Sequence, residues 1–428
     1  MAQLSDDCFA FGGELLTVDA ALRMIAAGVN CVEDIDQVAL VRADGRILAE
    51  DVLAAVDLPP FDNAAVDGYA VRLSDLEGWA DLEGWADLEG SPALPVDGRL
   101  AAGAPVIRPL TPMTTRRIFT GAAPPPGADT IFMQEDVRLD EHGHVRFPPG
   151  LRRGANTRPR GEDIAVGARA LRRGQRLRPQ DLALAAALGL RRLPVRRSIR
   201  IGLFSTGDEL VEPGLPAGPT QRYDSNRVLL AALAGRAGAH VTDLGILPDR
   251  RDTIAAALAE AARDNDLILT SGGVSTGEED HVKAAVEAGG RLVFWRLAIK
   301  PGRPVAMGSV AGVPFVGLPG NPAAAFITFV HVARPLIAAL SGTVVEAPAA
   351  MRVRAAFSYR KKTGRREYVR VRIEPGPDGE PIAHKHGVEG AGILTSLTGT
   401  HGLAELPEAV TAVVPGDRVN YLPYELMF

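Results

Sequence analysis

The stretch that most constrains the fold runs from Asp266 to His281 and places a glycine-rich turn directly after a short apolar run. Residues 267–269 form that run, which is typical of a strand buried in a parallel sheet. Gly272 and Gly273 follow Ser271, and glycine lets the backbone amides of a strand-to-helix turn approach an anion closely. The turn therefore predicts an anion site at the carboxyl end of a buried strand.

Three successive acids, from Glu278 to Asp280, occupy the same turn. Carboxylates repel a bare phosphate, so they favour a divalent cation between themselves and a substrate. Acids in the first turn of a helix also complement the helix dipole without binding anything. The spacing of the acids leaves both interpretations open.

Strand-like and helix-like segments alternate on both sides of this turn, from Ile199 to Leu340. That alternation predicts a parallel sheet with helices on both faces. Ligands of such sheets bind beyond the carboxyl ends of the strands. Four loops that carry acids, glycines or prolines leave those ends, namely Thr206–Glu209, Pro248–Asp249, Ser271–Asp280 and Pro319–Pro322.

The regions on either side of this segment are rich in short strands. Proline and glycine turns separate β-like runs before Gln134, and alternating strands follow Ser341, which predicts a C-terminal β-barrel or sandwich. Residues 75–90 read DLEGWADLEGWADLEG, a short acidic repeat that is typical of a solvated loop insertion.

The composition excludes several classes of function. A length of 428 residues with 46% hydrophobic residues predicts two to four domains with real cores. The net charge of −5 and the aromatic content of 5% argue against nucleic acid as a partner. The sequence shows no basic-then-apolar leader, no CxxC motif and, by inspection, no apolar span of 18 residues. We therefore expect a soluble, cytoplasmic protein without a membrane partner.

Seven motifs, in one order along the chain, resemble those of the molybdopterin molybdenumtransferases, the MoeA family that also includes the E domain of gephyrin. They are FDNAAVDGYAVR (Phe61–Arg72), FTGAAPPPGADTIFMQED (Phe119–Asp136), RGEDI (Arg160–Ile164), FSTGDEL (Phe204–Leu210), TSGGVSTGEED (Thr270–Asp280), AIKPGRP (Ala298–Pro304) and GLPGNP (Gly317–Pro322).

The resemblance implies a multidomain α/β and β protein. It implies an N-terminal region at 13–197, in which segments 13–48 and 165–197 enclose a β-rich domain at 49–164 that acts as a lid. It also implies a parallel-sheet, molybdopterin-binding-like α/β domain at 198–344 and a C-terminal β-barrel domain at 348–428.

The resemblance further implies the last step of molybdenum cofactor biosynthesis. Molybdenum from molybdate is inserted into adenylylated molybdopterin with release of AMP, and Mg²⁺ is required. The family enzyme is an elongated homodimer with a composite active site, and a molybdopterin adenylyltransferase is a possible further partner.

Site residues carry over by position. The catalytic set is Asp67, Asp163, Asp249, Asp280 and Lys300. The substrate-binding set is Thr120, Arg158, Ser271, Gly272, Gly273, Arg296, Pro319, Pro322 and Arg370, and the metal ligands are Glu209, Asp249 and Asp280. We expect the N-terminal members of one subunit to face the α/β domain of the other.

The chain departs from the family pattern in three places. Arg296 stands where many members have lysine, which keeps the charge but changes its geometry. Ala391 stands where many have serine, so one hydrogen bond to an oxyanion is missing. The acidic repeat at 75–90 has no counterpart that we identify.

Two other functions are weighed against this one. A molybdopterin adenylyltransferase shares the α/β domain but lacks the N-terminal motifs and the barrel, which this chain has. A non-catalytic, gephyrin-like scaffold is not separated from an enzyme by any sequence motif, although the full set of acids and Lys300 favours catalysis.

Overall fold

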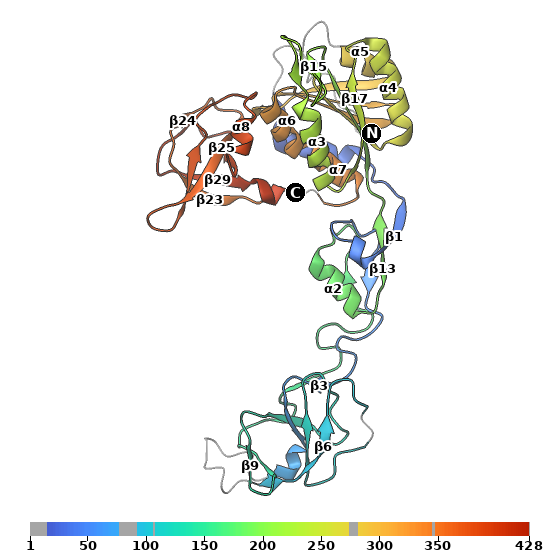
Figure 1. Ribbon diagram of the computed structural model, residues 1–428, viewed down its shortest axis with the longest axis vertical. Helices are drawn as coiled ribbons and strands as arrows, with labels where there is room; N and C mark the ends of the chain where they lie inside the picture. Colours follow the sequence, from blue (N-terminus) through green and yellow to red (C-terminus); the bar gives the residue numbers. More distant parts are fainter. Residues whose placement is uncertain (1–14, 77–91, 106–107, 274–280, 345–346, 428) are drawn as a thin grey trace.

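The chain is elongated, with an α/β domain and a β-barrel at one end and a β-rich domain at the other (Figure 1). The computed structural model describes residues 15–76, 92–105, 108–273, 281–344 and 347–427. A thin middle segment joins the two ends (Figure 1). The acidic repeat at 75–90 lies almost wholly outside the described residues, and so does Asp280.

The α/β domain is built on a six-stranded sheet in the order β17-β14-β18-β22-β21-β19. The strands β14, β17, β18 and β22 are parallel, whereas β21 is antiparallel to both of its neighbours. The predicted sheet is thus mixed at one edge, because the short turn between β21 and β22 permits only a hairpin. The strands are β14 (Arg200–Thr206), β17 (His240–Leu247), β18 (Leu267–Ser271), β19 (Gly290–Arg296), β21 (Pro304–Val310) and β22 (Val313–Leu318).

Helices cover both faces of this sheet, as its apolar strands require. In β18, Leu267 and Leu269 pack with α1, α3, α6 and α7, while Ile268 packs on the other face with α4 and α5. All three side chains are fully buried. The helices are α1 (Val18–Gly28), α3 (Ser225–Arg236), α4 (Arg251–Asp264), α5 (His281–Gly289), α6 (Pro322–Thr328) and α7 (Arg334–Leu340).

The long helix from Pro322 to Leu340 contains a π-helical turn at Phe329–Ala333. Pro335 has no backbone N–H, so it cannot donate to the carbonyl of His331. The N–H of Arg334 instead donates to Phe329, five residues back, which widens the helix there.

The same helix contradicts one expectation from the sequence. Within the described part of the chain, Pro322–Leu340 is long and apolar enough to cross a membrane, with a mean hydropathy of 1.7. The expectation that no apolar span of 18 residues exists is therefore wrong. The protein buries 83% of this window, as a core helix of a domain does.

The predicted C-terminal β-barrel is confirmed. Five strands close on themselves in the order β25-β26-β23-β29-β27, and β27 pairs back to β25. They are β23 (Met351–Ala355), β25 (Arg366–Pro375), β26 (Pro381–Lys385), β27 (Gly402–Leu406) and β29 (Arg418–Pro423). One strand of the α/β side, β20 (Ile299–Lys300), pairs in parallel with β25 and joins the barrel to the α/β domain.

The distant β-rich domain contains a four-stranded sheet in the order β6-β7-β4-β8, a three-stranded sheet and the pair β3–β11. Its strands are β3 (Asn63–Ala64), β4 (Gly68–Val71), β5 (Ala93–Leu94), β6 (Val96–Leu100), β7 (Thr115–Ile118), β8 (Thr130–Met133), β9 (Arg138–Leu139), β10 (Val145–Arg146) and β11 (Thr157–Arg158). The middle segment holds β1 (Ile35–Ala39), β2 (Val52–Leu53), β12 (Arg169–Leu171), α2 (Pro179–Ala187) and β13 (Arg192–Arg196).

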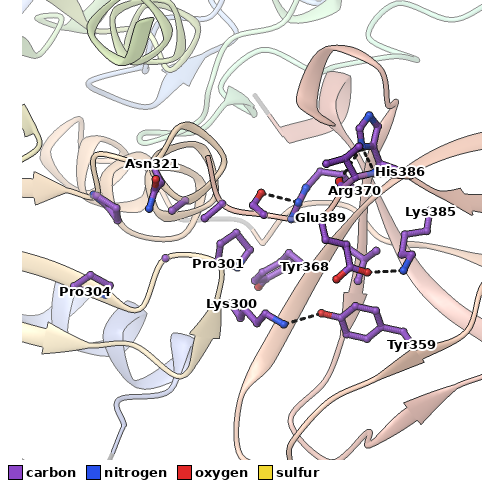
Figure 2. Close-up of a pocket in the computed structure, with 17 residues that line it drawn as sticks. Lys300, Pro301, Pro304, Asn321, Tyr359, Tyr368, Arg370, Lys385, His386 and Glu389 are labelled. Atoms are coloured by element: carbon purple, nitrogen blue, oxygen red, sulfur yellow. Dashed lines mark hydrogen bonds and ion pairs between the residues drawn. The ribbon is translucent and has the colours of Figure 1, made fainter. Parts of the chain in front are cut away.

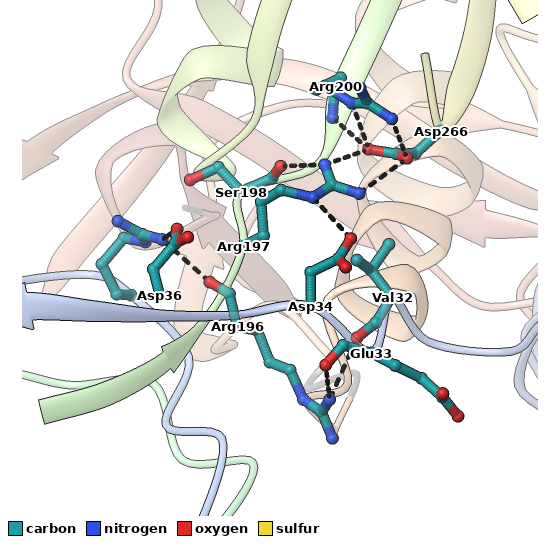
Figure 3. Close-up of polar contacts among 10 residues, drawn as sticks. Val32, Glu33, Asp34, Asp36, Arg196, Arg197, Ser198, Arg200 and Asp266 are labelled. Carbon is teal, nitrogen blue, oxygen red and sulfur yellow. Dashed lines mark hydrogen bonds and ion pairs between the residues drawn. The ribbon is translucent and has the colours of Figure 1, made fainter. Parts of the chain in front are cut away.

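An ionic network, partly buried around Asp266, attaches the middle segment to the α/β domain (Figure 3). The guanidinium of Arg197 lies 2.8 Å from Asp266 and 3.0 Å from Asp34. Arg200 approaches Asp266 from the other side, at 3.1 Å. Asp266 follows α4 and Asp34 precedes β1, so Arg197 fixes the start of the middle segment to the sheet.

Replacing Asp266 with Asn should lower the free energy of unfolding of the α/β domain. Burial opposes ionisation, but Arg197 and Arg200 outweigh it and lower the pKa of Asp266 to about 2. A carboxyl whose pKa is lower in the folded state stabilises that state at pH values above its ordinary pKa, here by about 2 kcal/mol. This contribution disappears as the pH falls through about 2. Thermal unfolding of both proteins should show a large difference near neutral pH and little difference in strong acid.

Candidate active site

Two predicted metal ligands lie at the carboxyl ends of neighbouring strands. Thr206 and Leu247 are register partners at the ends of β14 and β17, and Glu209 and Asp249 follow them. The Thr206 hydroxyl donates to Asp249 at 3.3 Å. Glu209 pairs with Arg222, whose hydrogen bond lowers the pKa of Glu209. Both carboxylates are therefore at one edge of the sheet.

The glycine turn after β18 lies beside them and requires its glycines. Gly273 has a φ of 64°, and an added Cβ would come within 2.4 Å of Val282 and 2.7 Å of Thr206. Gly272 also has a positive φ, of 90°, and its N–H donates to Leu318 at 3.1 Å. No other residue type would fit this turn without displacing α5 or β14.

Asn226 connects this turn to the loop before α6. Its side-chain amide donates to Ser271 Oγ and to the Gly320 carbonyl, both at 2.8 Å. Asn226 is 6% exposed, and its Oδ1 has no hydrogen-bond partner within the described structure. Asp224 caps α3, so the Asn226 side chain is available to hold the two loops together.

A cavity of about 280 Å³ opens between the α/β domain and the barrel (Figure 2). The α/β domain contributes Lys300, Pro301, Gly302, Pro304, Pro319, Asn321 and Ala324. The barrel side contributes Tyr359, Tyr368, Val369, Arg370, Lys385, His386, Val388, Glu389, Gly390 and Ala391. Three of its side chains, Lys300, Arg370 and Lys385, are cationic, which suits an anionic ligand.

Lys300 is held by two barrel residues. Its ammonium donates to the Tyr359 hydroxyl at 3.0 Å and lies 3.3 Å from Glu367. The Tyr359 hydroxyl in turn donates to Glu367 at 2.7 Å. Burial opposes the charge on Lys300, but Tyr359 and Glu367 outweigh it and raise the pKa of Lys300. The amine therefore stays protonated as an anion ligand.

Arg370 lines the same cavity and lies in β25, three residues after Glu367. Its guanidinium donates to Ser396 Oγ at 3.1 Å and to the Gly390 carbonyl at 3.0 Å. Burial lowers the pKa of Arg370, although a guanidinium stays charged. Ala391 lines the cavity, and its carbonyl accepts from Ala323 N at 2.9 Å.

The remaining α/β residues surround these groups. Pro319 lines the cavity and Pro322 begins α6 directly beside it. Arg296 ends β19 and is the register partner of Pro304, a lining residue, so it lies near the rim without lining the cavity.

The N-terminal members of the predicted site lie in the other half of the molecule (Figure 1). Thr120 donates to Asp67 from both its backbone N–H and its hydroxyl, each at 2.8 Å, and the backbone bond lowers the pKa of Asp67. Arg158, in β11, pairs with Glu162 at 2.8 Å, and Asp163 follows on the same exposed loop. Within one chain, the predicted site residues therefore lie in two separate groups.

Sequence reasoning missed several residues of the cavity. Tyr359, Lys385 and Glu389 belong to none of the seven motifs, and Glu367 is a carboxylate on the same strand face as Val369 and Val371. A carboxylate at every second position with two valines, on one face of a strand, was the signal in the sequence for a buried charge. Among the described residues, which exclude Asp280, no three His, Cys, Asp or Glu side chains gather into a metal site.

Three family models match the chain in sequence. The MoeA N-terminal region (domain I and II) matches residues 16–189, a probable molybdopterin binding domain matches 202–339, and the MoeA C-terminal region (domain IV) matches 352–424. The two outer matches disfavour a free-standing molybdopterin adenylyltransferase, which lacks those regions.

Full-length relatives agree. The molybdopterin molybdenumtransferase of Haemophilus influenzae is 36% identical over 96% of this chain and 99% of its own. Molybdopterin molybdenumtransferase 2 of Mycobacterium tuberculosis is 38% identical over 90% of this chain and 93% of its own. A solved structure of the MoeA protein of Pyrococcus horikoshii OT3 has a TM-score of 0.81 and 29% identity, covering 96% of this chain and 100% of that one. The chain belongs to the MoeA family, the molybdopterin molybdenumtransferases of molybdenum cofactor biosynthesis.

Proposed function

We propose that the protein transfers molybdenum from molybdate to adenylylated molybdopterin and releases AMP. The observation that carries this proposal is the cationic cavity between the α/β domain and the barrel. Lys300 and Arg370 face one cavity, and Asn226 ties the loop that borders it to the glycine turn. The cations of the cavity suit a tetrahedral oxyanion, and the backbone amides of the glycine turn suit a phosphate.

Each group has a distinct task in this proposal. Lys300 and Arg370 bind molybdate oxygens, and Tyr359 keeps Lys300 oriented toward them. The backbone amide of Gly273 approaches the pyrophosphate link, whereas the Gly272 N–H already donates to the Leu318 carbonyl and holds the turn in place.

Magnesium is the proposed metal, with Glu209, Asp249 and Asp280 as its ligands. Mg²⁺ takes oxygen ligands and is often bound by only one or two carboxylates plus water and phosphate. Glu209 and Asp249 fit this requirement, since both are carboxylates at one sheet edge. When bound, the ion would supply positive charge to the pyrophosphate that is cleaved.

We also propose a cytoplasmic homodimer with a composite active site. The β-rich domain, which contains Asp67, Thr120, Arg158 and Asp163, lies at the opposite end of the molecule from the barrel (Figure 1). Lys300 and Arg370 line the cavity beside the barrel. A two-fold assembly of an elongated chain can bring the N-terminal half-site of one subunit to the cavity of the other. A molybdopterin adenylyltransferase that delivers the substrate is the further proposed partner.

The activity can be measured directly as AMP release. Purified protein supplied with adenylylated molybdopterin, molybdate and Mg²⁺ should release AMP, and Asp249→Asn should reduce the rate by roughly a hundredfold, because a metal ligand is lost. Asp252→Asn provides the matched control, since Asp252 is an exposed acid in the first turn of α4 and should be dispensable. Equal rates for the two variants would rule out the metal assignment, and absence of AMP release from the unmodified protein would refute the function.

A further inference from the structure

Glu389 is a carboxylate inside a cavity that is otherwise suited to anions (Figure 2). It forms an ion pair with Lys385, four residues before it. That hydrogen bond is the main cause of its lowered pKa, and the charges of Lys300 and Arg370 lower it further. The carboxylate therefore lies within electrostatic reach of all three cations that would bind an oxyanion.

Glu389 is the one carboxylate among the described side chains that line the cavity. The cations Lys300, Arg370 and Lys385 also line it, so the lining carries two net positive charges with Glu389 in place and three without it. Glu367 lies outside the lining and is shared between Lys300 and Arg365. The Glu389 carboxylate repels a dianion such as molybdate more strongly than a monoanion, so it lowers the affinity of the cavity for the dianion most.

Of the two carboxylates, only Glu389 can move away. Glu367 is 1% exposed and contacts Tyr359, Lys300 and Arg365. The Glu389 side chain is 57% exposed, and Lys385 is its one ion-pair partner among the described residues. Water can therefore replace the contact that Glu389 gives up, at a small cost.

The loop backbone around Glu389 is anchored on both sides. His386 N donates to the Arg370 carbonyl at 3.0 Å before it, and Arg370 donates to the Gly390 carbonyl at 3.0 Å after it. The Ala391 carbonyl is held by Ala323 N. A rotation of the Glu389 side chain is thus sufficient, and the loop itself keeps its contacts with the oxyanion ligand Arg370.

We propose that Glu389 competes with a tetrahedral dianion for Lys385, and that this competition sets the affinity and the charge selectivity of the cavity. The inference rests on the proposed function, because it takes molybdate as the ligand of this cavity. Glu389 is not itself a ligand of the anion in this scheme; it leaves when the anion enters.

Glu389→Gln separates this role from a merely structural one, because it should strengthen binding. In calorimetric titrations with molybdate alone, the dissociation constant should fall by about five- to tenfold, since a nearby negative charge is gone. Perrhenate, a tetrahedral oxyanion with a single negative charge, should gain only about two- to threefold, because the repulsion scales with the charge of the ligand. Glu374→Gln is the matched control: Glu374 pairs with Arg372 on the barrel, does not line the cavity and should change neither affinity.

A second variant separates failure of this inference from failure of the site. Arg370→Met should abolish molybdate binding, and retained binding would show that the oxyanion binds elsewhere, which overturns both the site and the role of Glu389. If Arg370→Met abolishes binding while Glu389→Gln leaves molybdate affinity unchanged or weaker, only the role of Glu389 is overturned. An equal gain for molybdate and perrhenate would also overturn it, since competition by charge predicts unequal gains.

Discussion

Heterodimers of an Asp67→Asn subunit and a Lys300→Met subunit should recover about half of the unmodified activity, although each homodimer should be nearly inactive. Asp67 lies in the distant β-rich domain and Lys300 in the cavity beside the barrel (Figure 1). If each active site combines the first region of one subunit with the second region of the other, the heterodimer has one site with both residues intact. The second site carries both defects.

The measurement uses two affinity tags, co-expression and sequential purification, so that only heterodimers are assayed for AMP release. A heterodimer of Lys300→Met and Arg370→Met is the control, because both residues line the same cavity. In that pairing every site keeps one defect, so activity should stay near that of the homodimers. Recovery in the control, or none in the test pair, would contradict a composite site.

The α/β domain could be predicted from sequence because its signals are local. The run at 267–269 is apolar on both faces, and the structure buries Leu267 and Leu269 against one helical layer and Ile268 against the other. The turn after it needs Gly273 because an added Cβ would meet Val282 and Thr206, whereas the sequence argument gave the approach of an anion as the reason for the glycines. Loops at the carboxyl ends of these strands follow from the strand order alone.

The cavity could be predicted only in part, because its barrel side depends on long-range closure. Tyr359 and Lys385 come from separate strands of the barrel side. The ammonium groups of Lys300 and Lys385 lie 5.5 and 5.7 Å from the centre of the Tyr359 ring. No hydrophobic periodicity in the sequence predicts that these side chains lie together. The π-helical turn likewise follows from Pro335, whose effect appears one turn earlier than the residue itself. Residues 274–280, with the acids that first suggested a metal, lie outside the described structure.

The same substitution, glutamate to glutamine, should have very different effects on stability at Glu389, which lines the cavity, and at Glu367, which holds Lys300. Glu389→Gln, on an exposed loop, should change the free energy of unfolding by less than about 0.5 kcal/mol. Glu367→Gln should cost about 3 kcal/mol, because it leaves Lys300 and Arg365 without their buried counter-ion at the junction of β20 and β25. Chemical denaturation measures the free energy of unfolding of both variants, with hydrogen exchange of the β25 amides as the readout. Similar losses of stability in the two variants would contradict the burial argument.

Acid should remove the difference at Glu367, which ties its effect to charge and not to packing. Burial raises the pKa of this carboxyl, but the hydrogen bonds from Tyr359 and Arg365 outweigh burial and lower it below the ordinary value. Because the pKa is lower in the folded state, the carboxylate stabilises the protein at pH values above the ordinary pKa of glutamate. This contribution is lost as the pH falls through the pKa of the folded state. The unmodified protein and Glu367→Gln should therefore converge in stability on acidification. A gap that persisted at the lowest pH would assign the loss to the altered shape of the side chain and would contradict the charge argument.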